Sequence, residues 1–185
     1  MMGRGFWLMT AAVLGFAVHL ATVLYLPGLT FQRSLTRATA GAGSNHFFVM
    51  APEAQASLVP MASPQDIVGL CLLNLSKGPV VILAQVPHGL WNFAIYSASG
   101  QQTYGINDVQ AGGGSFTVDV SKSKSLLQQL SGKAAPEDAG QIANVGWHAE
   151  IAEANGIALL WVPVPDALQR PQLEKIVGLT RCQKK

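Results

Sequence analysis

The feature that most constrains this chain is a long stretch without charge near its beginning. No Asp, Glu, Lys or Arg occurs between Arg4 and Arg33, and the 21 residues Phe6–Leu26 are almost continuously apolar. As a helix this segment would rise about 30 Å, which matches the hydrocarbon core of a bilayer. Lipid offers no hydrogen-bond partner to the backbone, so a single segment crosses only as a helix. The sequence therefore predicts a membrane-spanning helix that ends at Pro27-Gly28.

A cleaved secretory signal is the alternative interpretation of this segment. Such signals carry about 7–15 apolar residues with a small-residue cleavage site directly after them. Here the apolar run is longer, and the nearest A-x-A pattern, Ala38-Thr39-Ala40, lies more than ten residues beyond it. The sequence therefore favours an uncleaved anchor over residues 1–28, followed by a tether over residues 29–45 with room for a short helical piece.

Composition places the rest of the chain among folded domains. Hydrophobic residues make up 49% of the 185 residues and charged residues 12%, against about 25% charged in usual soluble domains. Disordered chains need low hydrophobicity or high charge, so disorder is excluded as the main state. The net charge is +2 with scattered basic residues, which gives no footprint for nucleic acid. Residues 46–185 are expected to form one domain.

Beyond the tether, the pattern is that of short strands. Ile67–Leu75 is apolar on both alternating faces, as a strand that is covered on both sides requires. Val80–Val86 and Leu90–Ala98 follow across tight turns, and this short spacing predicts an antiparallel meander. Gln101–Ile106 and Ser115–Val120 are expected to continue it.

The pattern changes after these strands. Ser121–Leu130 has Leu residues at helical spacing and predicts a short amphipathic helix, whereas Ala134–Ala143 predicts a loop. Val145–Ile151 and Ile157–Val164 predict a hairpin around Glu153-Ala154-Asn155-Gly156, because Asn-Gly favours the tight turn.

Asp166 is expected to cap a closing helix from about Ala167 to Arg181, which Pro171 confines to the part after it. The fold class expected is therefore mainly β (α+β). One N-terminal transmembrane helix is followed by an antiparallel β-sandwich or half-open barrel with one or two short helices.

These segments, in this order, resemble a bacterial family called domain of unknown function 1254, in its small membrane-anchored form. The likeness spans roughly residues 45–182. The residues that carry it are the strand Ile67–Leu75 with Cys71, the turn Gly78-Pro79, the strand from Leu90-Trp91 to Ile95-Tyr96, and the run from Tyr104 to Asn107-Asp108.

The resemblance implies a β-rich domain held by a single pass in the bacterial inner membrane, facing the periplasm, from a family without an established activity. It also implies a protein partner, because relatives occur beside a sister family. Relatives often carry a basic residue after the Cys and an Arg after the Asn-Asp pair, where this chain has Leu72 and Val109. Any ligand role of those basic residues is absent here. Arg4 on one side of the span and Arg33 and Arg37 on the other leave its orientation undecided by charge.

The chain has two cysteines, Cys71 and Cys182. In an oxidising periplasm they could pair, and closing a loop of about 110 residues would stabilise the fold by about 4–5 kcal/mol in the entropic model. Free thiols are favoured instead, because Cys71 lies in an apolar strand and Cys182 lies three residues from the end. Two isolated cysteines predict no zinc site.

One polar and aromatic cluster is a candidate ligand site. Trp91, Tyr96, Tyr104, Asn107 and Asp108 could line a shallow pocket in which aromatic walls and a carboxylate orient a small polar ligand. The plainer interpretation is favoured: Asn-Asp bonds its own backbone in a turn, and the aromatic rings fill the core.

No motif predicts a reaction or a cofactor. His46, His88 and His148 lie in separate segments, and neither a G-x-S-x-G nucleophile elbow nor a phosphate-binding loop occurs. His148 and Glu150 share one face of a predicted strand, as exposed polar residues commonly do.

Three hypotheses remain open for function. The first is a non-enzymatic envelope protein that is fixed in lipid through residues 6–26 and binds a protein partner or a small ligand. The second is an enzyme, a hydrolase or lipid-modifying accessory factor, that works around Asn107-Asp108 or His148. The third is a structural subunit of a membrane complex, packed along Ala11, Ala12, Gly15 and His19.

Overall fold

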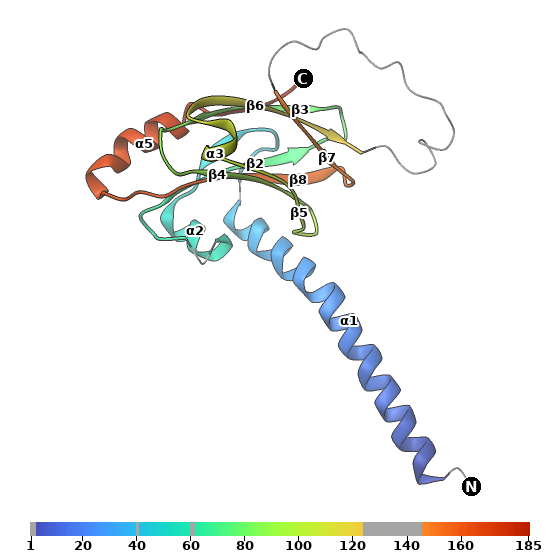
Figure 1. Cartoon of the computed structure of the whole chain (residues 1–185). Coiled ribbons are helices and arrows are strands. Elements are labelled where there is room, and N and C mark those ends of the chain that lie inside the picture. The colour runs from blue at the N-terminus through green and yellow to red at the C-terminus, as the bar shows by residue number, and fades with distance from the viewer. Residues whose placement is uncertain (1–2, 40, 60–61, 124–145) are drawn as a thin grey trace, which may run out of the picture.

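The computed structural model describes residues 3–39, 41–59, 62–123 and 146–185. The described part is one long helix followed by two packed β-sheets, which Figure 1 shows edge-on above the helix. The predicted fold class, a mainly β domain behind an N-terminal apolar helix, is confirmed.

Sheet A has the order β1-β2-β8-β4-β5, and all its neighbouring strands are antiparallel. Its strands are β1 (Phe47–Val49), β2 (Ile67–Asn74), β8 (Asn155–Val162), β4 (Asn92–Ser97) and β5 (Gln102–Asn107). Sheet B has the order β7-β6-β3-β9, in which β6 and β7 run parallel. Its strands are β7 (Trp147–Ile151), β6 (Gly114–Lys122), β3 (Val80–Val86) and β9 (Arg181–Lys184).

The main core lies between the two sheets. Alternate residues of each strand point into it, so that Phe93 and Ile95 of sheet A face Ile82 and Phe116 of sheet B. Trp91 is fully buried there and stacks on Phe116 with ring centroids 4.9 Å apart. The period of two in the sequence thus becomes the inner faces of a sandwich.

Consecutive strands mostly change sheet, so the predicted meander is wrong, except that β4 pairs with β5 as expected. The chain passes from β2 in sheet A to β3 in sheet B and back to β4, and β4 pairs with the distant β8. A tight turn limits the length of a connection but does not decide whether the next strand pairs or crosses to the facing sheet. When successive strands cross between the sheets, both sheets acquire an apolar inner face, and each inner face covers the other, as in sandwich folds.

The predicted hairpin around Asn155-Gly156 is also wrong. Both residues belong to β8, and the strand before it, β7, lies in the other sheet, parallel to β6. A Cβ on Gly156 would lie 2.9 Å from the Tyr96 carbonyl oxygen and 2.7 Å from the Ile151 side chain. The glycine therefore serves a close approach of β8 to its neighbours rather than a turn.

Helix α1 (Arg4–Ala38) continues beyond the predicted stop at Pro27-Gly28. Pro27 has no N–H to donate to the carbonyl of Val23, so the helix loses one backbone hydrogen bond there without ending. After Pro27, Phe31 and Leu35 pack against sheet A. Much of the segment expected as a tether, residues 29–38, is therefore helix.

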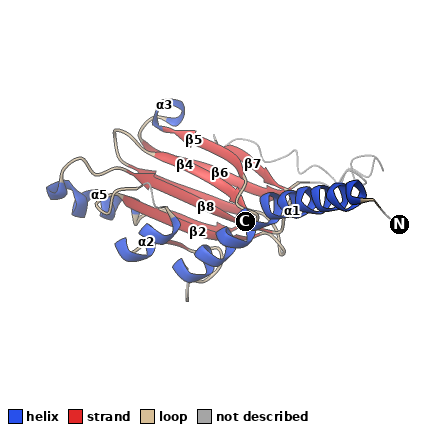
Figure 2. Ribbon diagram, turned by 90° about the horizontal axis from the view of Figure 1, so that it is seen from below, coloured by secondary structure: helices blue, strands red, loops and turns tan. Residues whose placement is uncertain are grey.

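The end of α1 packs on the outer face of sheet A together with α2 (Pro52–Leu58), and both helices lie on the same side of that sheet (Figure 2). We name this packing the outer apolar layer. Its buried members are Met50, Val68, Leu70 and Ile157, with Phe31, Leu35, Phe48, Ala54, Leu58, Val59, Ala62, Leu72, Leu159 and Trp161 packed against them. The prediction that Ile67–Leu75 is covered on both faces is confirmed.

Three short helices complete the described part. They are α3 (Asp108–Ala111), the 3₁₀-helix η1 (Ala167–Gln169) and α5 (Arg170–Val177). Asp166 accepts a hydrogen bond from the Leu168 backbone N–H at 3.0 Å, as its predicted capping role requires. The closing helix ends at Val177, however, and Arg181–Lys184 is strand β9, because pairing with β3 satisfies its backbone.

Two other predictions fall on the gap in the described residues. Ser121 and Lys122, expected to begin a helix, are the last residues of β6. Ser123 follows the strand without helical structure, and residues 124–130 of that predicted helix, like the loop predicted over Ala134–Ala143, lie outside the described residues.

Candidate functional site

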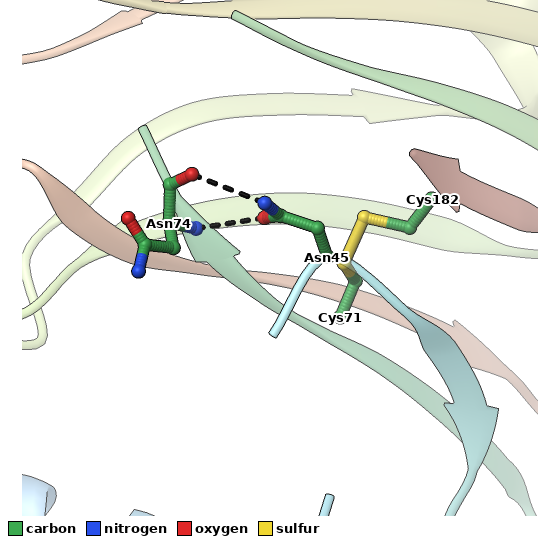
Figure 3. Close-up of a disulfide and its surroundings, with 4 residues drawn as sticks. All are labelled: Asn45, Cys71, Asn74 and Cys182. Atoms are coloured by element: carbon green, nitrogen blue, oxygen red, sulfur yellow. Dashed lines mark hydrogen bonds between the residues drawn. A yellow bond between two sulfur atoms is a disulfide. The ribbon is translucent and has the colours of Figure 1, made fainter. Parts of the chain in front are cut away.

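Cys71 and Cys182 form a disulfide that joins β2 of sheet A to β9 of sheet B (Figure 3), with their Cα atoms 6.5 Å apart. The sequence favours free thiols, in part because Cys182 lies three residues from the end of the chain, where residues are often frayed. In the structure, β9 is paired with β3 in the register Ile82↔Cys182, which holds that cysteine 6% exposed and facing the core. The bond therefore ties the two sheets together inside the sandwich.

Asn45 lies beside this bond and closes the end of β2 (Figure 3). Its side-chain N–H donates to the carbonyl of Asn74 at 3.1 Å, and its side-chain oxygen accepts from the Asn74 backbone N–H at 2.8 Å. The amide thus substitutes for a strand neighbour, which is a structural role.

The five residues of the predicted aromatic pocket do not come together. Trp91 is buried between the sheets, and Tyr104 packs against the same core. Tyr96 points to the opposite face of sheet A, where its ring lies 6.4 Å from that of Phe31. Burial raises the pKa of the Tyr104 hydroxyl above its ordinary 10.0.

Asn107 and Asp108 take local structural roles. Asn107 caps α3 in a reciprocal arrangement, in which its side chain accepts from the Gln110 backbone N–H at 3.1 Å and its backbone N–H donates to the Gln110 side chain at 3.2 Å. The Asp108 N–H donates to the Trp91 carbonyl at 3.4 Å. The pair therefore builds a cap, as its turn chemistry suggests.

His148 is the histidine that contacts potential catalytic partners. Its Nε2 lies 3.3 Å from the Ser121 hydroxyl and 3.6 Å from a Glu150 carboxylate oxygen. A catalytic triad needs the nucleophile on one ring nitrogen and the carboxylate on the other. Here both partners face one nitrogen on the open face of sheet B, so the trio does not have that geometry. No cluster of three His, Cys, Asp or Glu residues suited to a metal occurs in the part of the chain that the structure describes.

Asp66 is a buried carboxylate that accepts three hydrogen bonds. Its oxygens accept from the indole N–H of Trp161 at 2.9 Å, from the Ser63 backbone N–H at 3.0 Å and from the Val164 backbone N–H at 3.3 Å. This network fixes the loop before β2 to the end of β8.

Described residues line an open pocket of about 310 Å³ where α1 meets the sandwich, and we name it the junction pocket. The helix forms one wall, and the end of β2 and the start of β8 form the floor. The lining residues are Gln32, Leu35, Thr36, Ser44, Leu72, Leu73, Asn74, Ala98, Asn155, Gly156 and Ile157.

The lining of the junction pocket combines apolar side chains with uncharged polar ones. Asn74 and Asn155 are register partners at the ends of β2 and β8. Gln32 donates from its side-chain amide to the Ala98 carbonyl at 3.2 Å, which fixes the helix wall to the turn between β4 and β5. Such a surface suits a ligand with both an apolar and a neutral hydrogen-bonding part.

Sequence reasoning missed this pocket. Gln32 and Thr36 were assigned to a tether, and Asn155 was assigned to a turn. Their proximity depends on the packing of α1 on sheet A, which no local pattern encodes. The one available sign was a polar Asn74 at the end of an otherwise apolar strand.

No protein-family model matches the chain, and no curated protein matches it either. Among solved structures, the chain is similar to the VPA0106 protein from Vibrio parahaemolyticus, with a TM-score of 0.61 and 10% identity over 90% of this chain. The matched part is 38% of that protein, so this chain spans well under half of its length. A second match, to an uncharacterized protein from Burkholderia cenocepacia, has a TM-score of 0.45 and 12% identity over 77% of this chain and 34% of that one. At these identities the Vibrio match shows a shared fold.

Proposed function

We propose that this chain is a membrane-anchored envelope protein of the family that its sequence resembles, domain of unknown function 1254. Residues 6–26 cross a bacterial inner membrane, and the sandwich acts on the periplasmic side as a binding or accessory module. The observation that carries this proposal is that one uninterrupted helix, α1, is apolar and uncovered in its first part and is built into the domain in its last part.

The first part of α1 has the properties of a lipid-embedded helix. Within Gly5–Arg37, the most apolar window has a mean hydropathy of 1.9, and none of it is buried in the protein. The hydroxyls of Thr10 and Thr22 donate to the carbonyls of Phe6 and Val18 in the same helix, each at 2.9 Å. Lipid would therefore meet no unsatisfied hydroxyl at these two positions.

The last part of α1 argues against removal as a secretory signal. Cleavage after Ala40 would take away Phe31, Gln32 and Leu35, which contact sheet A. Val68 and Leu70, now fully buried, would lose part of their cover. A signal peptide is dispensable to the fold it exports, whereas this helix end is part of the packing.

The disulfide supports a compartment outside the cytoplasm. Structural disulfides persist in oxidising compartments and are rare in reducing ones. Cys71 and Cys182 are both buried, so the bond is shielded from solvent thiols. The bond is therefore consistent with a periplasmic domain.

A protein partner belongs to the proposal. Leu90, in the loop before β4, and Val109, in α3, expose 58% and 86% of their surface, and the hydrogen bond from the Asp108 N–H to the Trp91 carbonyl joins these two segments. Mild extraction with crosslinking should recover the chain with a defined neighbour. A chain that elutes alone as a monomer would contradict this part of the proposal.

The anchoring is tested by membrane extraction at alkaline pH and by the intact mass of the recovered chain. We expect the full-length chain in the membrane pellet. A Leu14→Lys, Val18→Lys variant should leave the pellet, because each central lysine costs about 2.5–3.5 kcal/mol on the insertion scale. Leu179→Lys, at a site 60% exposed on the domain, is the matched control and should remain. A water-soluble chain that has lost its first forty residues would overturn the proposal.

The side of the membrane needs its own test. A reporter that is active only outside the cytoplasm, fused after Lys185, should be active in the full-length chain. Activity from a cytoplasmic reporter at the same position would overturn the periplasmic assignment while leaving the anchor intact.

A further inference from the structure

We infer that the junction pocket holds the headgroup of an anionic phospholipid whose terminal alcohol is uncharged and rich in hydroxyls, such as glycerol. The inference rests on the proposed function, because it takes residues 6–26 as the membrane span. It names the ligand class of the pocket between α1 and sheet A.

The first argument is depth. Gln32, the first helix residue in the pocket wall, lies six residues after Leu26, a rise of about 9 Å along the helix. The headgroup region occupies about 5–7 Å on each side of the hydrocarbon core. If the helix is tilted, the height of Gln32 above the hydrocarbon core is less than about 9 Å and approaches the thickness of the headgroup region. The pocket therefore lies at the outer part of the headgroup layer.

The second argument is continuity between the pocket and the apolar helix surface. Tyr25 lies seven residues before Gln32, which places it about 20° away around the helix and about 10 Å lower. Leu29 lies between them on the same side, and Tyr25 and Leu29 expose 72% and 51% of their surface. An acyl chain lying along this side of α1 would therefore lead its headgroup toward the pocket.

The third argument is the chemistry of the lining, which has no charged side chain. Headgroups that end in an ammonium need a carboxylate or an aromatic cage, and neither lines the pocket. Ser44 and Asn155 instead offer a hydroxyl and an amide, and Asn74 adds its amide N–H while its side-chain oxygen accepts from Ser76. These groups match a polyol. A volume of about 310 Å³ is at the lower end of the range for ligand pockets and accommodates a glycerol-sized group.

The fourth argument is charge beside the pocket. Arg33 and Arg37 are exposed on the same helical turns as the pocket-lining Gln32 and Thr36. No Asp or Glu occurs anywhere in α1. Basic residues at this depth attract anionic lipid, which favours a lipid with a net negative charge from its phosphate.

The test uses the full-length chain in nanodiscs made from equal parts of phosphatidylglycerol and phosphatidylethanolamine, followed by native mass spectrometry of the released protein. We expect phosphatidylglycerol to be retained in preference. Asn155→Leu removes an amide and fills the pocket, so it should lower that retention about tenfold, equivalent to about 1.4 kcal/mol. Gln183→Leu, an exposed amide on β9 in the other sheet, is the matched control and should retain the lipid like the wild type.

A second variant guards against misfolding. Thr36→Leu fills the pocket from the helix wall with a strong helix former, so the fold should survive and retention should again fall. Equal retention of both lipids, or unchanged retention in both pocket variants, would overturn this inference while the chain still sediments with membranes. Recovery of a soluble, shortened chain would overturn the proposed function and the inference together.

Discussion

The two outer faces of the sandwich differ in what covers them. On sheet A, Val68 and Leu70 point away from the core between the sheets and are nevertheless fully buried, because α1 and α2 lie over them. On sheet B, Leu83 is 37% exposed, and His148 and Glu150 are more than half exposed. One face is therefore a second core and the other is a solvated surface.

The strands themselves carry this difference. β2 is buried at six of its first seven positions, whereas β3 alternates between buried and exposed positions along its length. A strand that is covered on both sides has to be apolar throughout, whereas a strand with one solvent-exposed face alternates apolar and polar residues. The apolar outer face of sheet A is the side of the domain on which α1 packs, because the end of α1 covers part of that face (Figure 1).

The largest effect is expected from the bond that joins the two unlike sheets. Replacing both cysteines, Cys71→Ala with Cys182→Ala, should lower the free energy of unfolding by about 4 kcal/mol, because the bond closes a long loop in the unfolded chain. The sequence separation is 111 residues. Urea unfolding of the full chain in detergent measures this loss, and reductant should mimic it in the wild type only. A loss below about 1 kcal/mol would show that strand pairing alone holds the sheets together.

A matched pair of leucines tests the comparison directly. Leu70→Ala on the covered face should cost about 2–5 kcal/mol, because it empties a fully buried site. Leu83→Ala on the open face should cost less than about 1 kcal/mol, because water already reaches the side chain. Equal losses in urea unfolding would contradict the claim that the two faces differ.

The two parts of α1 give a smaller effect. Phe31→Ala should lower the free energy of unfolding by about 1–2 kcal/mol, less than for a fully buried ring, because the side chain is half-buried against Tyr96 and Gly100. Leu24→Ala, on the uncovered part of the helix and 73% exposed, should leave the unfolding of the domain unchanged. A null result for Phe31→Ala would mean that the helix end covers sheet A without stabilising it.

Local patterns predicted several elements well and their partners poorly. The strands Ile67–Asn74 and Val80–Val86 fall within one residue of the predicted limits, because alternation and flanking turns are local properties. The sheet that each strand joins is not local: β3 pairs with β9, about a hundred positions away. Asn155-Gly156 is the sharpest example, since a strong turn signal gave way to the packing of β8 against Tyr96.

The end of the chain and the candidate pocket were missed for the same physical reason. Arg181–Lys184 carries three polar residues and has no strand pattern of its own. Its pairing with β3 places Cys182 beside Ile82, facing the core. The junction pocket draws on Gln32, Ala98 and Asn155 from three separate segments. Contacts between distant segments define both features, whereas sequence patterns report on neighbours along the chain.

The smallest expected effect concerns Tyr104, on the edge strand β5 of sheet A. Burial raises its pKa above the ordinary 10.0, so the folded protein prefers the neutral hydroxyl more strongly than the unfolded chain does. This contribution to stability is present in full below about pH 10 and is lost as the pH rises through the raised pKa of the folded state. Tyr104→Phe cannot ionise, so its stability should fall less than that of the wild type between pH 9 and pH 11 in urea unfolding, with the Tyr96→Phe variant as the control. If the free energy of unfolding changed with pH in the same way for Tyr104→Phe and the wild type, the Tyr104 hydroxyl would be solvated in both states. The edge of sheet A would then be as exposed to solvent as the outer face of sheet B.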